Sequence, residues 1–220
     1  MTPATLAYVG PFIAFMAFLM AGPYLVPLGR WEFPLRVFLL AGVIWYCSRR
    51  VLSFRCVAPV QSVLIGIGVI VVWVAPDLLF PGYRSHWLFQ NSIMGQLKTS
   101  IEGQFLDDPM VLFFRTARAV LIVPIVEELF WRGWMMRWLI KPEFEEIALG
   151  TLDLRAFLIT AALFASVHGP FWEVGLICGL VFNWWMVRTK SLGDLMLTHA
   201  VANLALSLYT IATKQWQYWL

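Results

Sequence analysis

Long apolar runs fill most of this chain, and short polar segments separate them. A helix that crosses a bilayer needs about 20 apolar residues, with a range of about 17 to 25. Seven runs approach or reach this length, and each predicts a membrane-spanning helix. The predicted spans are 6–28, 33–47, 57–79, 110–140, 156–168, 171–187 and 195–212.

The fourth run is longer than a bilayer is thick. A helix over 110–140 extends about 45 Å, against about 30 Å of hydrocarbon core. We therefore expect it to break in two or to project from the membrane, and Pro124 is the expected breakpoint because it has no backbone N–H. The sequence thus predicts an all-α, polytopic transmembrane bundle of seven or eight helices, in one domain over residues 1–220.

The segment between the third and fourth spans has a different pattern. Its apolar residues recur every four positions, and polar residues occupy the other faces. The periodic residues are Phe89, Ile93, Leu97, Ile101 and Phe105. This spacing predicts an amphipathic helix that lies on the membrane surface, or that acts as a lid or guide for a substrate.

The composition supports a membrane protein and excludes several other classes. Hydrophobic residues make up 60% of the chain and charged residues 13%, against about 45–50% and about 25% in soluble domains. The chain has a net charge of +3 but no soluble basic domain that could present a nucleic-acid-binding surface. We therefore expect no nucleic-acid partner. The three cysteines are scattered and odd in number, which argues against a disulfide framework.

Two adjacent glutamates, Glu127 and Glu128, stand among apolar residues in the fourth run. A charged residue at membrane depth costs about 2.5–3.5 kcal/mol on insertion scales, so such a pair predicts a functional site. Arg132 lies four residues after Glu128, where one helical turn brings the two side chains together. A simple ion pair at a helix end is the structural alternative.

Three later polar residues complete the candidate set. Phe164 lies four residues before His168, and Asn203 lies four residues after His199, so each pair is expected to share one helix face. Taken singly, either histidine fits a hydrogen-bonded packing role. Because ionisable groups inside a membrane need partners or water, the histidines, Asn203, the glutamate pair and Arg132 together predict one site.

Arg115 and Arg118 stand one turn apart near the start of the fourth run. We expect these side chains to extend to the membrane interface, or to pair with Asp107 and Asp108 just before them. Neither arginine is part of the predicted site.

The candidate residues suit hydrolysis of an amide by activated water. A buried carboxylate can act as general base toward water, and a histidine can hold that water. Asn203 and a histidine N–H can donate to the oxyanion of the tetrahedral intermediate. The same groups also match a catalytic zinc site with Glu127, His168 and His199 as ligands. No H-E-x-x-H motif supports a metal, and the residues leave the choice open.

Three motifs follow one another on successive predicted helices: Glu127-Glu128-x-x-x-Arg132, Phe164-x-x-x-His168 and His199-x-x-x-Asn203. In this order they resemble the motifs of the CPBP family (CAAX protease and bacteriocin-processing, also called Abi) over about residues 111–209. The resemblance implies an intramembrane endopeptidase of about eight helices with a membrane-embedded cavity. It implies a bilayer-embedded, multi-pass protein, for which we expect the bacterial inner membrane, and a membrane-anchored peptide or protein substrate.

The resemblance also assigns roles to residues. Glu127 would activate the water and His168 would help to hold it, while His199 and Asn203 would form the oxyanion hole. The supporting residues would be Glu128 and Arg132, which maintain the geometry, and Phe164, which lines the pocket. Family members are described both as metalloproteases and as glutamic proteases, so zinc stays an implied alternative. The chain also resembles CAAX prenyl protease-related proteins of exosortase and PEP-CTERM systems, which implies a lipidated or C-terminally sorted substrate.

Two other classes of function use the same residues. A family member without turnover would serve as an immunity or scaffold protein, although the intact catalytic positions argue against this reading. A proton-coupled transporter would need a polar path across the membrane. The first three predicted spans contain almost no polar residues, which argues against transport.

Overall fold

The computed structural model describes residues 2–219. The principal helices are α1 (Pro3–Met20), α3 (Glu32–Ser48), α4 (Pro59–Leu79), α8 (Leu154–Ser166), α9 (Trp172–Thr189) and α10 (Leu192–Thr213). A continuous central rod, Pro109–Trp138, comprises α5 (Pro109–Ala117), η4 (Arg118–Ile122), α6 (Val123–Glu128), η5 (Leu129–Met135) and α7 (Met136–Trp138). Shorter turns are α2 (Gly22–Leu25), η1 (Val26–Trp31), η2 (Tyr83–Ser85), η3 (Gly103–Phe105), η6 (Phe144–Glu146), η7 (Gly169–Phe171) and η8 (Trp216–Tyr218). No strand occurs in the described residues beyond one isolated bridge, so the predicted all-α class is confirmed.

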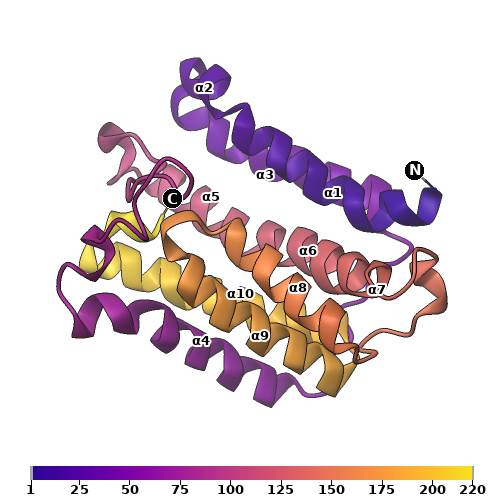
Figure 1. Cartoon of the computed structure of the whole chain (residues 1–220). Helices are drawn as coiled ribbons and strands as arrows, with labels where there is room; N and C mark the ends of the chain where they lie inside the picture. The colour runs from indigo at the N-terminus through magenta and orange to yellow at the C-terminus, as the bar shows by residue number, and fades with distance from the viewer. Residues whose placement is uncertain (1, 220) are drawn as a thin grey trace.

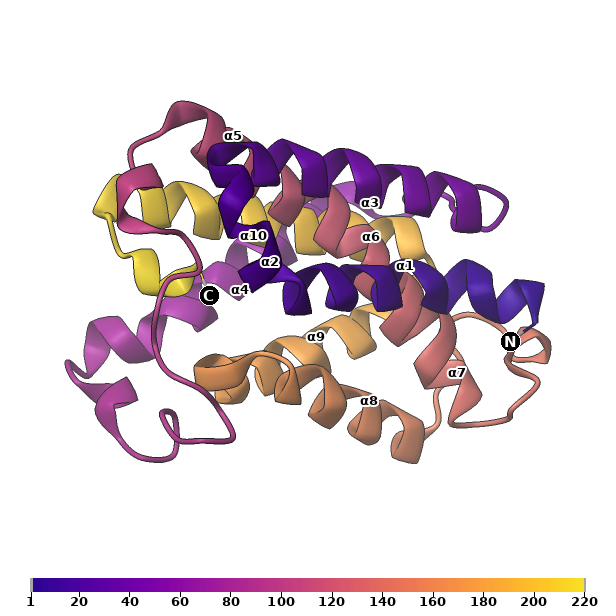
Figure 2. The ribbon, with the colours of Figure 1, turned by 90° about the horizontal axis from the view of Figure 1, so that it is seen from above.

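The rod lies between two groups of helices (Figure 1; Figure 2). On one side, α1 and α3 form an antiparallel pair that packs against the rod. On the other side, α10 packs against both the rod and α4, while α8 runs beside α9. Elements far apart in the sequence therefore surround the segment that carries the two adjacent glutamates.

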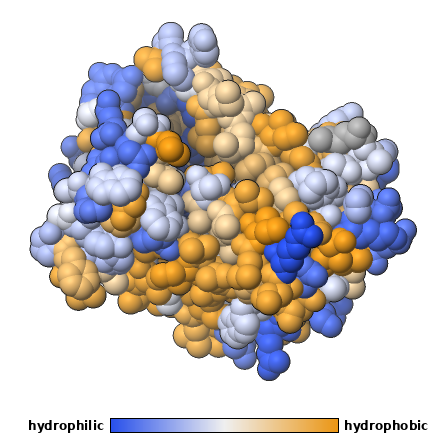
Figure 3. Space-filling view, viewed as in Figure 1, coloured by the Kyte–Doolittle hydropathy of each residue, from blue (hydrophilic) through white to orange (hydrophobic). Residues whose placement is uncertain are grey.

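The surface has the distribution of polarity expected for a bilayer protein. Hydrophobic residues cover the middle of the molecule, and hydrophilic ones gather toward the ends of the helices (Figure 3). A soluble monomer rarely exposes so large an apolar surface. Within residues 2–219, five helices are long and apolar enough to cross a membrane. The second and fifth predicted spans correspond to α3, with 17 residues, and α8, with 13.

The rod does not break at Pro124, so of the two alternatives expected for the fourth run, division is wrong; projection of the long helix from the membrane stays a prediction. The preceding turn, η4, is π-helical, and its register pairs the N–H of Val123 with the carbonyl of Arg118, five residues earlier. Pro124 has no N–H for the next carbonyl in this register, that of Ala119. Asn203 on α10 supplies a donor, with Nδ2 2.7 Å from the Ala119 oxygen. A neighbouring helix thus satisfies the carbonyl that the proline leaves without a partner.

Residues 86–102 form turns and irregular backbone, so the expected amphipathic helix is wrong. Asn91 Oδ1 accepts from the backbone N–H of Ile93 and of the next residue, each at 2.9 Å. A side chain that accepts from nearby backbone donors competes with helix formation. Phe89 and Ile101 are buried while Ile93 is 86% exposed, so the periodic residues do not share one face.

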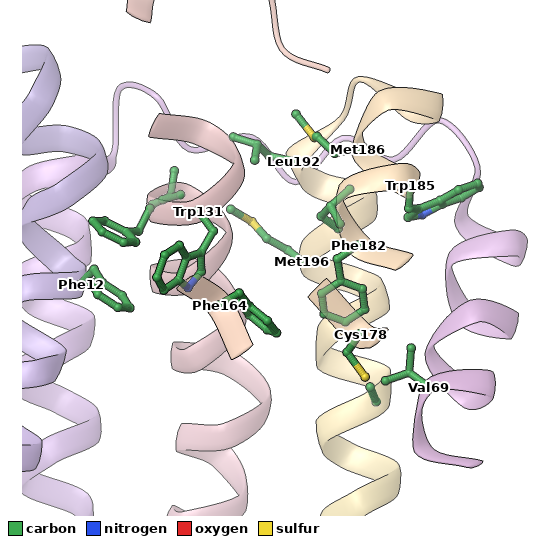
Figure 4. Close-up of a cluster of buried hydrophobic side chains, with 14 of the residues drawn as sticks. Phe12, Val69, Trp131, Phe164, Cys178, Phe182, Trp185, Met186, Leu192 and Met196 are labelled. Carbon is green, nitrogen blue, oxygen red and sulfur yellow. The ribbon is translucent and has the colours of Figure 1, made fainter. Parts of the chain in front are cut away.

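Aromatic packing joins the rod to α8 and α9 (Figure 4). The ring of Phe164 on α8 lies near both Trp131 of the rod and Phe182 of α9, with centroid separations of 6.0 and 6.2 Å. Gly66 of α4 allows α4 and α10 to approach each other closely. An added Cβ at Gly66 would lie 2.6 Å from the carbonyl oxygen of Thr198 on α10. These contacts determine where the candidate residues on α8 and α10 lie relative to the rod.

Candidate active site

Glu128 is the more deeply buried member of the glutamate pair, with 0% of its surface exposed. Its two carboxylate oxygens lie 3.2 and 3.1 Å from Nη1 of Arg132, one turn later on the rod. Oε1 also lies 2.8 Å from Nδ1 of His199 on α10. Removing one partner of such a buried ion pair leaves a charge without compensation, which is strongly destabilising. Glu128 therefore links the rod to the helix that carries His199.

Arg132 extends the same network to α8 and α9. Its Nε donates to Asn183 Oδ1 at 2.8 Å, and its Nη2 donates to the Gly179 carbonyl at 3.4 Å. The Asn183 amide in turn donates to the Phe157 carbonyl on α8 at 2.8 Å. The guanidinium also lies 4.5 Å from the centroid of the Phe164 ring. Sequence reasoning missed Asn183, whose only signal is a polar amide within an apolar run.

Glu127 has a different environment from its neighbour. It is 7% exposed and lines two adjoining cavities. Its Oε2 has no hydrogen-bond partner among the described residues. A buried polar atom without a protein partner calls for an explanation, and a site for water or substrate is one. Of the two adjacent carboxylates, Glu127 is thus the one open to a reactant.

Hydrogen bonding determines which nitrogen of His199 carries a proton. Glu128 is paired with Arg132 and accepts, so Nδ1 of His199 is the donor in the 2.8 Å contact. In the neutral ring, Nε2 then holds a lone pair and accepts hydrogen bonds. Nε2 becomes a donor only when the ring is protonated, and Glu128 is placed to form an ion pair with that state.

His168 lies two residues beyond the end of its helix, but its ring still lies 4.5 Å from that of Phe164 between centroids, so the two side chains face the same side as expected. The helix α8 ends at Ser166, and the glycine and proline that follow His168 do not continue it. The Nδ1 of His168 still lies 2.6 Å from the Phe164 carbonyl, which can only accept. Nδ1 therefore carries the proton, and Nε2 presents a lone pair.

A buried arginine outside the predicted set holds the turn that follows His168. Arg84 donates to the Pro170 carbonyl at 2.7 Å and pairs with Asp77 at 2.9 Å and Glu173 at 2.7 Å. Tyr218 also donates to Asp77, and burial together with this carboxylate raises the pKa of the tyrosine hydroxyl. Sequence reasoning missed Arg84 because its partners come from distant segments.

Asn203 faces the rod from α10. One of its amide N–H groups donates to the Ala119 carbonyl, and this contact also fixes the orientation of the amide, because a carbonyl can only accept. The second N–H remains for another acceptor. Since Asn203 lines both of the cavities that Glu127 lines, that acceptor can belong to a bound molecule.

Two adjoining cavities share Glu127, His168 and Asn203 in their linings. The first has a volume of about 120 Å³, and most of its other lining side chains are apolar or aromatic. The second has a volume of about 240 Å³ and is also lined by Arg115 and Arg118. The candidate catalytic groups thus stand between an apolar compartment and a basic one.

Arg118 adopts neither of the arrangements expected for it. The acids before α5 pair elsewhere, Asp108 with Arg30 at 3.5 Å and Asp107 with Lys214 at 3.7 Å. Arg118 is 7% exposed and lines the second cavity, so its guanidinium does not extend to an interface. Arg118 instead lines the second cavity together with Glu127, His168 and Asn203, which the local sequence does not show.

The proposed zinc ligands, Glu127, His168 and His199, do not fit a shared metal ion in this arrangement. Within residues 2–219, no group of three His, Cys, Asp or Glu side chains lies close enough to hold one. The Nδ1 atoms of both histidines donate to the Phe164 carbonyl and to Glu128, so only their Nε2 lone pairs remain as possible ligands. The expected metal set is therefore not assembled, and no step below is assigned to a metal.

The side chains at the two cavities have the chemistry that activation of a water molecule needs. An unpartnered carboxylate, two imidazoles and an amide N–H gather at the two cavities. A carboxylate can accept a proton from water, and an amide N–H can stabilise a developing oxyanion. The set needs no serine or cysteine nucleophile.

Residues 109–205 match the family model described as type II CAAX prenyl endopeptidase Rce1-like. The matched segment contains the rod, α8, α9 and most of α10, and it includes every motif residue from Glu127 to Asn203. The match confirms the resemblance drawn from the motifs. The family match implies a membrane peptidase. No curated protein and no solved structure matches the chain.

Proposed function

Since residues 109–205 fall in the type II CAAX prenyl endopeptidase Rce1-like family, we propose that this chain is an intramembrane endopeptidase that uses water activated by Glu127. The observation that carries the proposal is that Glu127 lines both cavities, while its buried Oε2 has no hydrogen-bond partner among the described residues. His168 and Asn203 line the same junction. A general base and an oxyanion donor on one cavity are the groups that amide hydrolysis requires.

In the proposed reaction, Glu127 accepts a proton from a water molecule while the water oxygen attacks the carbonyl carbon of the peptide bond. The Nε2 of His168 accepts the second hydrogen of the water and holds it in place. The carbonyl oxygen becomes an oxyanion. The intermediate then collapses, the C–N bond breaks, and the leaving nitrogen takes the proton from Glu127.

Two donors stabilise the oxyanion in this scheme. The second N–H of Asn203 is one, since its first N–H is engaged with the Ala119 carbonyl. Protonated His199 is the other, because Nε2 donates only in that state while Nδ1 remains on Glu128. Removing a single oxyanion donor typically costs about 10²- to 10³-fold in kcat. Glu128 and Arg132 act as positioning residues, because they hold His199 rather than contact the reacting atoms.

The proposed substrate is a membrane-anchored peptide or protein, lipidated or sorted through its C-terminus, in a bacterial inner membrane. An apolar cavity of about 120 Å³ beside the catalytic groups supports an apolar group near the cleaved bond. The apolar belt around the bundle supports a substrate that arrives from the bilayer.

The test is cleavage of a fluorogenic prenylated CAAX peptide by purified protein in detergent, compared between the native chain and Glu127→Gln. General-base catalysis contributes about 10²- to 10⁴-fold, so we expect kcat to fall by at least about 10²-fold while peptide binding persists. Glu145→Gln is the matched control, because Glu145 belongs to a second glutamate pair in an exposed loop. It should cleave at the native rate.

Two results would contradict the proposal. One is a Glu127→Gln protein that cleaves as fast as the native chain. The other is the absence of cleavage by the native chain of both the CAAX peptide and the membrane-anchored peptides of its host. The second result would favour the immunity or scaffold reading.

A further inference from the structure

His168 reaches the two cavities from a turn that follows a helix. The helix α8 ends at Ser166, and Gly169 has a φ of 53°, a left-handed conformation that glycine adopts without strain. Within the turn, the N–H of His168 donates to the Ala165 carbonyl and the His168 carbonyl accepts from the N–H of Phe171, each at 3.0 Å. These bonds are all local, so the direction of the imidazole depends on what holds the turn from outside.

Arg84 holds this turn through three separate contacts of its guanidinium. Nη1 donates to the Pro170 carbonyl at 2.7 Å. Nε donates to Asp77 on α4 at 2.9 Å, and Nη2 forms an ion pair with Glu173 on α9 at 2.7 Å. The rigid, planar guanidinium sends its donors in fixed directions, whereas the ammonium group of a lysine is one compact charge. Arg84 thus fixes the turn relative to two helices.

Aromatic contacts connect Arg84 to the imidazole by a second route. The guanidinium lies 4.0 Å from the centroid of the Phe171 ring. Phe171 stacks on Trp73 with centroids 5.8 Å apart, and Trp73 meets the His168 ring edge-on at 5.5 Å. The imidazole also packs closely against α9, where a Cβ added at Gly175 would lie 3.2 Å from Cβ and Cγ of His168. A displacement of the turn would therefore move the His168 side chain.

Arg84 acts at a distance from the reacting atoms. It lines neither of the two cavities that contain Glu127, and it lies outside residues 109–205, which match the family model. We propose that Arg84 is a positioning residue, which holds the turn at Pro170 and thereby directs Nε2 of His168 toward the water that Glu127 activates. This inference rests on the proposed peptidase function and adds to it a residue from the N-terminal half of the chain.

A purely structural reading is that Arg84 only fastens the segment after α4 to the bundle. That segment has other attachments. Trp172 Nε1 donates to the Leu88 carbonyl at 3.1 Å, and the Phe89 side chain is buried. Gln90 Nε2 donates to the backbone carbonyl of Arg84 at 2.7 Å, a bond that does not depend on the arginine side chain. A change of that side chain therefore tests the turn more than the attachment of the segment.

The experiment uses two variants, because removing Arg84 alone leaves Asp77 and Glu173 without their counter-charge. Arg84→Met removes the donor to the turn. The triple variant Arg84→Met, Asp77→Asn and Glu173→Gln removes the donor and both carboxylate charges, so it should be more stable than Arg84→Met. In both we expect kcat for peptide cleavage to fall by up to about 10²-fold, as misplacement of a catalytic group can cause. KM should stay unchanged, because Arg84 lines neither cavity.

A spectroscopic readout separates positioning from a structural role. The chain contains three histidines, His86, His168 and His199, so nitrogen NMR of labelled histidine gives signals that His86→Asn and His168→Asn assign. Native His168 should show an imidazole protonated on Nδ1, because this atom donates to the Phe164 carbonyl. The triple variant should shift or broaden the His168 signal. The His199 signal should stay unchanged, because Glu128 holds that ring.

The matched control is Arg30→Met. Arg30 also pairs with an aspartate, Asp108 at 3.5 Å, but its side chain is 53% exposed. This variant should leave kcat and all three histidine signals unchanged. In the triple variant, a native kcat or an unchanged His168 signal would overturn the positioning role. Equal shifts of His168 and His199 would overturn it too, because they would indicate a general loss of structure.

The histidine signals are read without turnover, so this inference and the proposed function can fail separately. A His168 signal that moves in the triple variant, in a protein whose native chain cleaves no peptide, supports the positioning role and refutes only the peptidase function. Cleavage by the native chain that persists unchanged in both Arg84 variants refutes only the positioning role.

Discussion

Neighbouring residues of the same type have different chemistry here because their partners differ. Glu128 is bound by Arg132 and His199, while Glu127 lines two cavities and has one oxygen without a partner in residues 2–219. The distinction follows from the helix: adjacent side chains point about 100° apart around the axis, so one faces α10 and the other faces the cavities. Activity and stability should therefore respond differently to the two glutamates.

We predict that Glu128→Gln destabilises the fold as well as slowing the reaction. It leaves Arg132 buried without its counter-charge, and breaking one side of a buried ion pair costs about 3–5 kcal/mol. The free energy of unfolding in mixed detergent micelles measures this loss. Glu127→Gln should be nearly neutral in the same assay, since the Oε2 of Glu127 has no partner to lose.

A second substitution tests the cause of that instability. Adding Arg132→Met to Glu128→Gln removes the uncompensated charge, so the double variant should be more stable than Glu128→Gln alone. Its kcat should stay low, because His199 has lost the carboxylate that orients it. A double variant less stable than either single variant would show that the pair does not act as a compensated unit.

At the scale of helices, the placement of the candidate residues depends on a few close contacts between helices and on two π-helical turns. The turns η4 and η5 flank α6, which carries both glutamates, and π-helical turns frequently mark functional sites. On the opposite side, α4 holds α10 through Gly66, which faces the Thr198 carbonyl. The alignment of α10 with the rod therefore depends in part on a glycine in another helix.

We predict that Gly66→Ala destabilises the bundle by about 1–3 kcal/mol, as overpacking of a tight contact does. The added Cβ would lie 2.6 Å from the Thr198 carbonyl oxygen and 2.9 Å from Val201, so the two helices must separate. The free energy of unfolding in mixed micelles is the measurement. Cleavage should slow as well, because α10 carries His199 and Asn203.

Gly68→Ala is the matched control on the same helix. A Cβ at Gly68 has no atom within 4 Å, so its effect should stay within about 0.5 kcal/mol. Equal effects of the two substitutions would argue that the contact between α4 and α10 is looser than the structure indicates.

At the scale of the whole molecule, the site exists only because distant segments enclose it. The first cavity is lined from α4, the rod, α8, α9 and α10, and the second adds α1 and the segment after α10. A water-activating carboxylate is effective when bulk solvent is kept away from it. The bundle provides that enclosure, and the bilayer around its apolar belt completes it.

We predict that metal removal leaves activity unchanged. Among the described residues, no group of three His, Cys, Asp or Glu side chains lies close enough to hold an ion. The measurement is the rate of CAAX-peptide cleavage after dialysis against a chelator, with and without added zinc. Loss of activity that zinc restores would contradict the prediction, and would require Glu127, His168 and His199 to approach one ion more closely than they do here.

The apolar runs and motif residues were readable from the sequence because they depend on local composition and spacing. Those features correctly predicted an all-α bundle, the approximate positions of its helices and the family of its second half. Hydrophobic burial in a bilayer acts on each run largely independently, so segment length alone identifies a span.

Only the tertiary structure decided which groups are available for chemistry. The Ala119 carbonyl that Pro124 leaves unpaired is satisfied by Asn203, 84 residues away, and the turn after His168 is held by Arg84. Likewise, Arg118 has local sequence features of an interfacial arginine but lines a cavity together with Glu127. Hydrogen-bond partners and cavity-lining residues come from segments far apart in the chain, so a local sequence pattern does not show them.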